Sequence, residues 1–430
     1  MIPQSTPDFR IVARRAGLAS AVAAIYALCC WSPGLLALLG IATAGVWFLD
    51  LEGALAASDA HAAGLNPLGH NPLDVFHRPH MYTDWWYALR WFGLTRADYL
   101  WVGALLGLAF LIVALLQVRV RRTSEMVLAL AVVAAPPVIF SFVRGNADMA
   151  IFIVLAPAVA CLLSPHAPLR WLAVAVIAFA TGLKSYPAIA GLILLAPTRP
   201  RREIVAQVSL FAILVILLAF DQFRDLATNL HGYNLERRLP GFYTYGLTVT
   251  ARLLAAPGWW TAVLVGALVA FAGAWWRWLP RWEPSVEQRA DHLRLVMGAA
   301  LLVGCYFAEI NYAYRAVFAI WLVPLLAQAW TATDWPPAIR RLGQVTLVLL
   351  LAWLWSDGLA CVVLNGFARP TSLQIDVWSK WIVLAQQPVV FLLMAALLAW
   401  LVAFARAGLE GLGRASNKTA ANAPLETASN

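Results

Sequence analysis

Two short polar motifs interrupt long apolar stretches of this chain, and they contain the side chains best suited to chemistry. The first, RGNAD, runs from Arg144 to Asp148, and the second, KSYP, begins at Lys184. Ionisable groups at membrane depth are costly and rarely persist without a function. Because Lys184 lies between apolar segments, it must bind an anion or extend to water. We predict that Lys184 and Arg144 bind a phosphate, and an ion pair between Lys184 and Asp148 is the competing interpretation.

Other residues of the same motifs are predicted to hold substrate. Gly145 and Asn146 allow a tight turn at the start of a helix, where backbone N–H groups favour anions. An ordinary turn between helices would use the same two residues. We predict Asn146, Asp148 and Tyr186 as substrate-binding residues. The alternative role for Asp148 is to orient the neighbouring cations.

Asp50 is the candidate catalytic residue. It follows the apolar residues Trp47, Phe48 and Leu49, where the first polar loop begins. A carboxylate there can take the proton of a sugar hydroxyl as that hydroxyl attacks a donor. A helix-end carboxylate in contact with water is the competing interpretation. We predict that Asp50 is a general base.

A third polar segment runs from Glu309 to Arg315 and contains two tyrosines. Such polar and aromatic side chains form edges that bind sugars or phosphates. They also form interfacial aromatic belts, in which charged side chains extend to water. We predict Glu309 as a substrate-binding residue and Arg315 as part of a sugar- or phosphate-binding edge.

Four histidines lie in the first polar loop, between residues 61 and 80. The order His77-Arg78-Pro79-His80 would suit zinc, but no Cys or nearby carboxylate completes a tetrahedral set, and Pro79 disfavours pairing on a helix. We therefore predict no cofactor, with a divalent metal permitted but not required. His80 or Arg78 is predicted to help bind the acceptor.

The composition indicates the class of protein. The 430 residues are 62% hydrophobic and only 12% charged, and a soluble domain would carry about twice that charge. We predict an all-α polytopic membrane protein, with one integral-membrane domain over residues 1–414 and a disordered tail over residues 415–430. The net charge of +9 fits positive cytoplasmic loops rather than nucleic-acid binding, because Lys and Arg lie between apolar stretches. The sequence contains no Gly-rich nucleotide loop, which disfavours a nucleotide-sugar mechanism.

About twelve membrane spans are predicted, since a crossing needs roughly 20 apolar residues, or fewer inside a bundle. The first run could turn into a hairpin at Trp31-Ser32-Pro33-Gly34, but the flanking charges favour one crossing plus an interfacial stretch. The short fifth and sixth spans are expected to break between Lys184 and Pro187. The predicted spans are 16–49, 99–117, 125–142, 149–164, 171–183, 185–197, 204–220, 257–276, 294–308, 316–332, 342–356 and 381–405.

The arginines predict how the chain is oriented. Arginines before the first span and after the second both mark the cytoplasm, so an even number of crossings separates them. The same rule places both termini in the cytoplasm and the loops 50–98, 221–256 and 357–380 outside. Their content of Trp, Tyr and Pro suits short amphipathic helices at the membrane surface. The candidate site residues then lie on the extracytoplasmic side.

Three blocks within residues 45–200 resemble glycosyltransferase family 87, a branch of the GT-C membrane glycosyltransferases. The blocks are Asp50 with Ala57 and the GLNP motif at 64–67, RGNAD at 144–148, and GLKSYP at 182–187. The resemblance implies a GT-C-like helical fold with about twelve transmembrane helices and an active site at the extracytoplasmic surface. It implies a polyprenyl-phosphate sugar, commonly mannose or arabinofuranose, as the donor. It also implies that Asp50 matches the family's catalytic aspartate and Lys184 its conserved lysine.

The second half of the chain departs from the family pattern. Where several relatives carry a histidine near the tenth span, this chain has Tyr312, Tyr314 and Arg315. Arg315 is therefore the candidate to take over binding of the donor phosphate.

Together these features predict a multi-pass glycosyltransferase of the cell membrane. It would move one sugar, with inversion, from a polyprenyl-phosphate donor to a glycolipid or cell-envelope glycan, with membrane lipids as further partners and no nucleic acid. A transporter or flippase of a lipid-linked or anionic solute is the first alternative. The charges near the outer span ends and the lack of paired repeat halves in the sequence count against it. A non-catalytic partner in an envelope-building complex is the second alternative.

Overall fold

The computed structural model describes residues 9–41, 45–68, 70–197, 199–230, 242–253, 259–307, 311–365 and 372–421. Labels with η denote 3-10 helices. The first half contains α1 (Phe9–Trp31), α2 (Pro33–Leu38), α3 (Leu49–Ala62), η1 (Asp84–Phe92), η2 (Arg96–Asp98), α4 (Tyr99–Gln117), α5 (Thr123–Val133), α6 (Pro136–Arg144), α7 (Ala147–Leu155), α8 (Ala158–Leu162), α9 (Ala167–Leu183) and η3 (Tyr186–Leu195). The second half contains α10 (Arg201–Leu230), β1 (Thr244–Tyr245), α11 (Leu247–Leu253), α12 (Trp259–Trp278), α13 (Arg289–Phe307), β2 (Asn311–Tyr312), η5 (Ala313–Trp321), α14 (Val323–Leu326), η6 (Ala327–Trp330), α15 (Pro337–Val363) and α16 (Ser372–Ala421).

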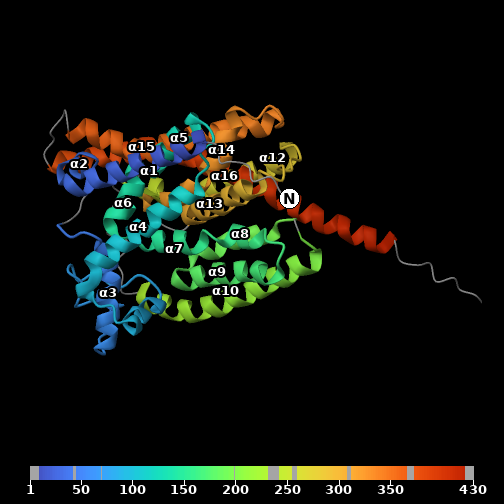
Figure 1. The fold of residues 1–430 in the computed structure, drawn as a ribbon. Coiled ribbons are helices and arrows are strands. Elements are labelled where there is room, and N and C mark those ends of the chain that lie inside the picture. Colours follow the sequence, from blue (N-terminus) through green and yellow to red (C-terminus); the bar gives the residue numbers. More distant parts are fainter. Residues whose placement is uncertain are drawn as a thin grey trace, which may run out of the picture.

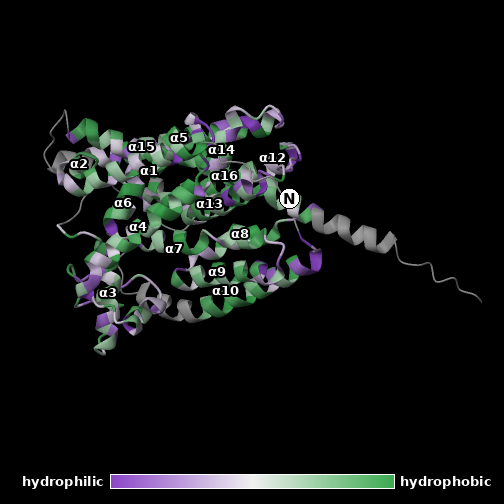
Figure 2. Ribbon diagram, in the orientation of Figure 1, coloured by the Kyte–Doolittle hydropathy of each residue, from purple (hydrophilic) through white to green (hydrophobic). Residues whose placement is uncertain are grey.

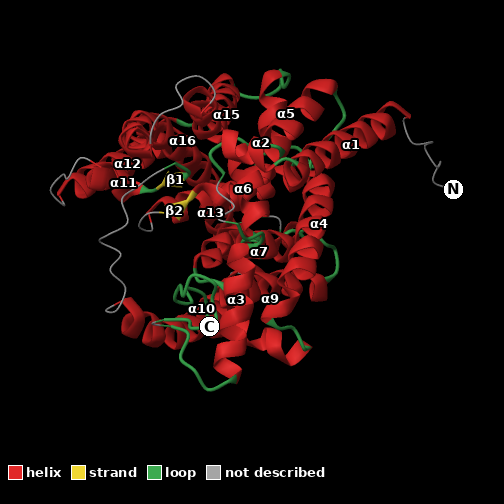
Figure 3. Ribbon diagram, turned by 90° about the vertical axis from the view of Figure 1, so that its left-hand side faces the viewer, coloured by secondary structure: helices red, strands yellow, loops and turns green. Residues whose placement is uncertain are grey.

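The helices pack into an elongated bundle, with α3 and the short helices after it at one end (Figure 1). A view from that end shows α3 in the lower part of the molecule and the short strands β1 and β2 next to each other (Figure 3). Apolar residues dominate the long helices, and hydrophilic residues gather around α3 and at the turns (Figure 2). This distribution is that of an all-α polytopic membrane protein.

The described helices support seven membrane spans by length and composition, or up to nine if each of two bent pairs is one span. Three shorter apolar stretches, 147–162, 167–183 and 186–195, complete the set. Each predicted span overlaps one of these helices or pairs. The number that crosses the membrane stays a prediction, because the shorter stretches fall below the length of an independent crossing.

The first apolar run holds one helix of spanning length, α1, followed by the short helix α2. The break falls at Ser32, whose side-chain oxygen accepts a hydrogen bond from the Leu35 backbone N–H at 3.4 Å and so caps α2. Pro33 occupies the first helical position, where its missing N–H costs nothing. The first apolar run therefore forms one long helix, α1, and one short helix, α2, rather than a hairpin of two long helices.

The last helix of the chain extends into the segment predicted as a tail. α16 continues to Ala421 and so enters the segment 415–430, for which we predicted a disordered tail. The helix can continue because this stretch contains no proline or glycine up to Ala421, and alanine is the best helix former. Residues 422–430 lie outside the described residues.

Prolines produce the breaks that matter for the site. α5 and α6 meet at 48°, where Ala135 is extended before Pro136. Proline disfavours helical backbone in the residue before it and lacks an N–H of its own. Lys184 is also extended (φ −163°, ψ 135°), between α9 and η3, with Pro187 in the first turn of η3. The predicted break between Lys184 and Pro187 is confirmed.

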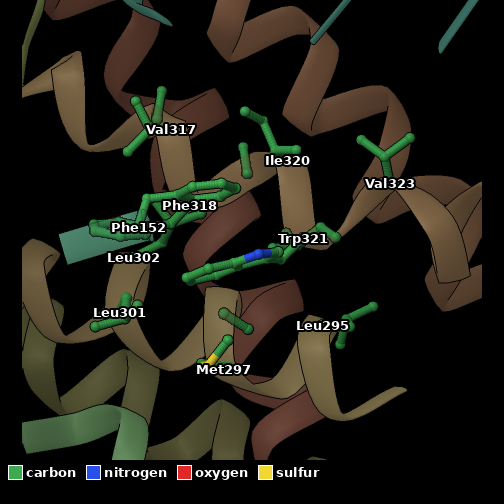
Figure 4. Close-up of a cluster of buried hydrophobic side chains, with 14 of the residues drawn as sticks. Phe152, Leu295, Met297, Leu301, Leu302, Val317, Phe318, Ile320, Trp321 and Val323 are labelled. Carbon is green, nitrogen blue, oxygen red and sulfur yellow. The ribbon is translucent and has the colours of Figure 1, made fainter. Parts of the chain in front are cut away.

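The interior of the bundle fixes the elements that carry the site. The ring of Phe152 in α7 stacks on that of Trp321 in η5, with centroids 4.4 Å apart and planes 11° apart. Phe318 lies against both rings (Figure 4). α13 runs through the centre of the bundle, since 78% of its apolar stretch is buried, compared with 6% for the peripheral helix α12. Close packing of this cluster holds α7 and η5 in a fixed relation.

Two short strands join loops that are distant in sequence. β1 and β2 pair antiparallel, with Thr244 opposite Tyr312 and Tyr245 opposite Asn311. The Ala313 N–H extends the pairing by donating to the Tyr243 carbonyl at 2.6 Å. The pairing fixes the chain immediately before Arg315.

Candidate active site

Asp50 lies in the first turn of α3, and three side chains bind its carboxylate. Arg144 donates to Oδ1 from Nε at 3.1 Å and from Nη2 at 2.5 Å. Arg78 donates to the same oxygen from Nη1 at 3.3 Å. Asn146 donates from Nδ2 to Oδ2 at 2.7 Å. Residues far apart in sequence therefore converge on the predicted base.

The RGNAD turn explains how Arg144 and Asn146 reach Asp50. Gly145 ends α6 with a left-handed backbone (φ +59°), and a Cβ there would lie 2.8 Å from the Cβ of Phe48. Glycine avoids both the strain and the clash. Asn146 then caps α7 by accepting a hydrogen bond from the Asp148 N–H at 2.9 Å. The predicted tight turn at a helix start is confirmed.

Asp148 lies on the other side of this turn and binds a second set of residues. Its side chain is 0% exposed. Oδ1 accepts hydrogen bonds from Lys184 Nζ and the Tyr186 hydroxyl, both at 2.7 Å. Arg315 Nε approaches Oδ2 at 3.6 Å. The structure thus contains the ion pair between Lys184 and Asp148 that competed with phosphate binding in the sequence.

The cluster of Lys184, Arg315 and Asp148 carries an excess of positive charge. Lys184 and Arg315 share the one carboxylate of Asp148, so one cation has no matching anion in this cluster. Among the described residues, Arg315 Nε and Nη1 and Asp148 Oδ2 make no hydrogen bond. Buried polar atoms without partners are costly. The cluster can therefore accept an anionic group next to its unused N–H donors.

Tyrosine rings surround these cations. Lys184 Nζ lies 5.2 Å from the ring centre of Tyr82, 5.3 Å from that of Tyr186 and 6.0 Å from that of Tyr314. The Arg315 guanidinium lies 4.9 Å from the ring centre of Tyr186. Aromatic faces attract cations, and they also present flat apolar surfaces. Tyr186 thus holds the cation cluster together.

The charged groups face one cleft with a volume of about 350 Å³. Its lining contains four cations and two carboxylates, and Asp148 lies directly behind it. Asn146 and Tyr186 do not line the cleft but hold the residues that do. Glu309 lies outside the described residues. The lining residues are Asp50, Gly53, Ala54, Asp74, Arg78, Pro79, His80, Met81, Tyr82, Phe140, Arg144, Lys184, Tyr312, Tyr314 and Arg315.

Arg78, rather than His80, reaches the catalytic candidate. Asp74 positions Arg78 by accepting from Nε at 3.1 Å and from Nη2 at 2.7 Å. Burial raises the pKa of Asp74, but the hydrogen bonds and charge of Arg78 outweigh burial and hold the pKa below its usual value. Gly53 makes room for this pair, because a Cβ there would lie 2.8 Å from Arg78 Nη2. The loop sequence offered Arg78 only as an alternative to His80.

His80 lines the cleft as a neutral side chain. It is 6% exposed, and its Nε2 lies 3.4 Å from the Thr83 carbonyl oxygen. Burial lowers the pKa of His80 to about 4, although the Thr83 carbonyl opposes the shift. The predicted role of His80 in acceptor binding is therefore that of a neutral ring. The described part of the chain shows no group of three or more His, Cys, Asp or Glu residues arranged to hold a metal ion.

Comparison with known protein families gives a match to this chain. The family model of glycosyltransferase family 87 matches residues 86–307. That stretch includes Arg144, Asp148 and Lys184, whereas Asp50 precedes it and Arg315 follows it. No curated protein and no solved structure matches the chain.

Proposed function

Since the chain belongs to glycosyltransferase family 87, we propose that this membrane protein transfers a mannose-like or arabinofuranose-like sugar from a polyprenyl-phosphate donor. The acceptor is a lipid-linked or cell-envelope glycan on the extracytoplasmic side. One observation carries the proposal: a carboxylate and four cations from separate parts of the chain line the same cleft. A glycosyl transfer from a lipid phosphate needs these two kinds of group, a base for the acceptor and cations for the leaving phosphate.

The cations are suited to the leaving group. As the bond between the sugar carbon and the phosphate oxygen breaks, negative charge grows on the polyprenyl phosphate. Lys184, Arg144 and Arg315 line the cleft and can stabilise that charge electrostatically. The Nε and Nη1 nitrogens of Arg315 have no hydrogen-bond partner among the described residues, so they can donate to the phosphate. Cationic side chains can supply the charge compensation that a metal ion supplies in other transferases.

Asp50 is suited to act on the acceptor. A carboxylate has about four lone-pair positions, and Oδ2 accepts one hydrogen bond from the described residues, that of Asn146. The hydroxyl of an acceptor can donate to Oδ2 and transfer its proton there as its oxygen bonds to the sugar carbon. With the phosphate leaving from the opposite side, the sugar carbon inverts. Arg144 and Arg78 on Oδ1 orient the Asp50 carboxylate.

A transporter of a lipid-linked anion is the second candidate, because the structure places the Lys184–Asp148 pair at a helix break. Broken helices with charged residues bind substrates in many transporters. The transporter would move a lipid-linked solute without forming a covalent product. It also gives Asp50 and its three ligands no chemical role.

Transfer assays on Asp50→Asn test the proposal. Membranes containing each variant receive radiolabelled polyprenyl-phosphate mannose or polyprenyl-phosphate arabinofuranose, and glycosylated products are separated from donor. Asn keeps the size of Asp but cannot act as a base, so we expect transfer to fall by at least about a hundredfold. Asp59→Asn on the same helix is the matched control, because Asn can still accept the hydrogen bond from the Arg96 N–H. Full transfer by Asp50→Asn would show that Asp50 is not the base. Movement of the lipid-linked solute into proteoliposomes without a glycosylated product would favour the transporter.

A further inference from the structure

A second cavity lies at the opposite end of α13 from the cleft. It has a volume of about 430 Å³, and its walls include Trp275, Trp282, Trp400 and Phe404. α13 begins beside this cavity at Arg289 and ends shortly before β2, which borders the cleft. A helix of this length spans about 28 Å, close to the thickness of the hydrocarbon layer. The two cavities therefore lie near opposite faces of the membrane.

A buried histidine faces this second cavity without a polar partner. His292 is 8% exposed and lines the cavity. Its ring lies edge-to-face against Trp282 and Phe404, with centroids 5.4 and 5.7 Å away. Within the described ranges, neither ring nitrogen of His292 has a hydrogen-bond partner. An imidazole always has at least one N–H donor, and a ligand oxygen in the cavity can accept a hydrogen bond from it.

Arginines surround the histidine. Arg289 lies three residues before His292 and thus on the same face of α13, and its side chain has no ion pair with any described residue. Arg281 and Arg406 share the single carboxylate of Glu410, with Nε–oxygen distances of 3.0 Å each. Three guanidiniums and the carboxylates of Glu283 and Glu410 line the cavity, so its lining carries a net positive charge.

We propose that this cavity binds one anionic phospholipid, with its phosphate between Arg289 and His292. The aromatic walls and the exposed rings of Trp276 and Trp278 at the end of α12 cover the adjoining apolar part of the lipid. Basic pockets between transmembrane helices at the cytoplasmic side recognise acidic headgroups in this way. An interfacial belt of Trp and Arg alone would need neither a recessed cavity nor a buried, unpartnered imidazole. This site is independent of the glycosyl transfer proposed above.

The test measures lipid bound to the full-length protein. Wild type, R289Q and H292Q are reconstituted in nanodiscs of phosphatidylcholine with or without phosphatidylglycerol, and retained lipid is counted by native mass spectrometry. Arg289 is exposed, so R289Q should fold even if H292Q does not. We expect phosphatidylglycerol to bind at least about tenfold more weakly to R289Q, since a hydrogen bond to a charged group has been lost. R277Q is the matched control, because Arg277 is exposed, lies in the last turn of α12 and does not line the cavity.

Three outcomes would overturn the proposal. Equal retention of phosphatidylglycerol by wild type and R289Q would show that Arg289 binds no headgroup. An equal loss in R277Q would reduce the effect to general attraction between arginines and an acidic membrane. A rise in melting temperature with inorganic phosphate in phosphatidylcholine discs, equal to the rise with phosphatidylglycerol, would show that the site takes a free anion rather than a lipid.

Discussion

Comparing Asp148→Asn with Lys184→Gln separates the contribution of the buried charge cluster to fold stability from its contribution to transfer. Asp148 is fully buried and is the carboxylate that contacts both Lys184 and Arg315. Its neutral replacement leaves two cations without their anion, and removing one partner of a buried pair costs about 3–5 kcal/mol. Lys184→Gln should cost less, because Asp148 keeps Arg315 at 3.6 Å and the Tyr186 hydroxyl at 2.7 Å. We expect Asp148→Asn to be the less stable variant.

Transfer activity should not follow the order of the stabilities. Lys184→Gln removes a cation from the cleft, so transfer falls even though most of the fold stability remains. The double variant Asp148→Asn, Lys184→Gln removes both charges of the pair, and it should recover about 1–3 kcal/mol relative to the sum of the single changes. Recovery of stability without recovery of transfer would identify Lys184 as both a partner of Asp148 and a ligand of the phosphate.

Thermal unfolding of purified protein in detergent measures the stabilities, and transfer in membranes measures the activities. Tyr186→Phe is the control, because it removes one hydrogen bond to Asp148 and no charge, and it should cost about 1 kcal/mol. An Asp148→Asn variant that is no less stable than Lys184→Gln would contradict this order of stabilities. A double variant without coupling between the two positions would contradict the ion pair's contribution.

Three further changes follow from single contacts. Gly145→Ala should destabilise the protein by about 1–3 kcal/mol in thermal unfolding and reduce transfer, because φ is +59° and the new Cβ would meet Phe48. The pKa of His80 is about 4 in the folded protein and about 6.5 in the unfolded chain, so between these pH values the unfolded chain binds the proton more readily. The free energy of unfolding should therefore decline by about 3 kcal/mol as pH falls from 6.5 to 4. His80→Gln should lose this part of the pH dependence of the melting temperature. Gly53→Ala should displace Arg78, lower transfer strongly and lower the melting temperature only slightly. A large fall in melting temperature together with the loss of transfer would contradict a positioning role for Gly53.

The sequence predicted the parts of the site that depend on local structure. The RGNAD turn and the break after Lys184 both follow from Gly, Asn and Pro, whose backbone preferences act over a few residues. The ion pair between Lys184 and Asp148 was one of two stated interpretations, and the structure contains it. Arg315, predicted as a ligand of the donor phosphate, lines the same cleft as Lys184 and Arg144, and its role stays a prediction.

The remaining features depend on tertiary packing. Neither charge nor spacing indicated that Arg78 rather than His80 would contact Asp50, because Arg78 is aimed by Asp74 and by the space above Gly53. The sequence also showed no sign of the second cavity, since its walls come from α12, α13, α16, the segment 279–284 and residues 196–197. Apolar runs locate the helices, but their length does not decide which of the short ones cross the bilayer.

The pairing of β1 with β2 has a consequence for biogenesis. Thr244 and Tyr245 leave the ribosome well before Asn311 and Tyr312, and α12 and α13 must be synthesised between them. Two paired residues form too small a sheet to be stable alone, so the ladder depends on the helices around it. Arg315 can therefore join Asp148 only after most of the bundle has been inserted. The charge cluster of Asp148, Lys184 and Arg315 is therefore completed late in synthesis.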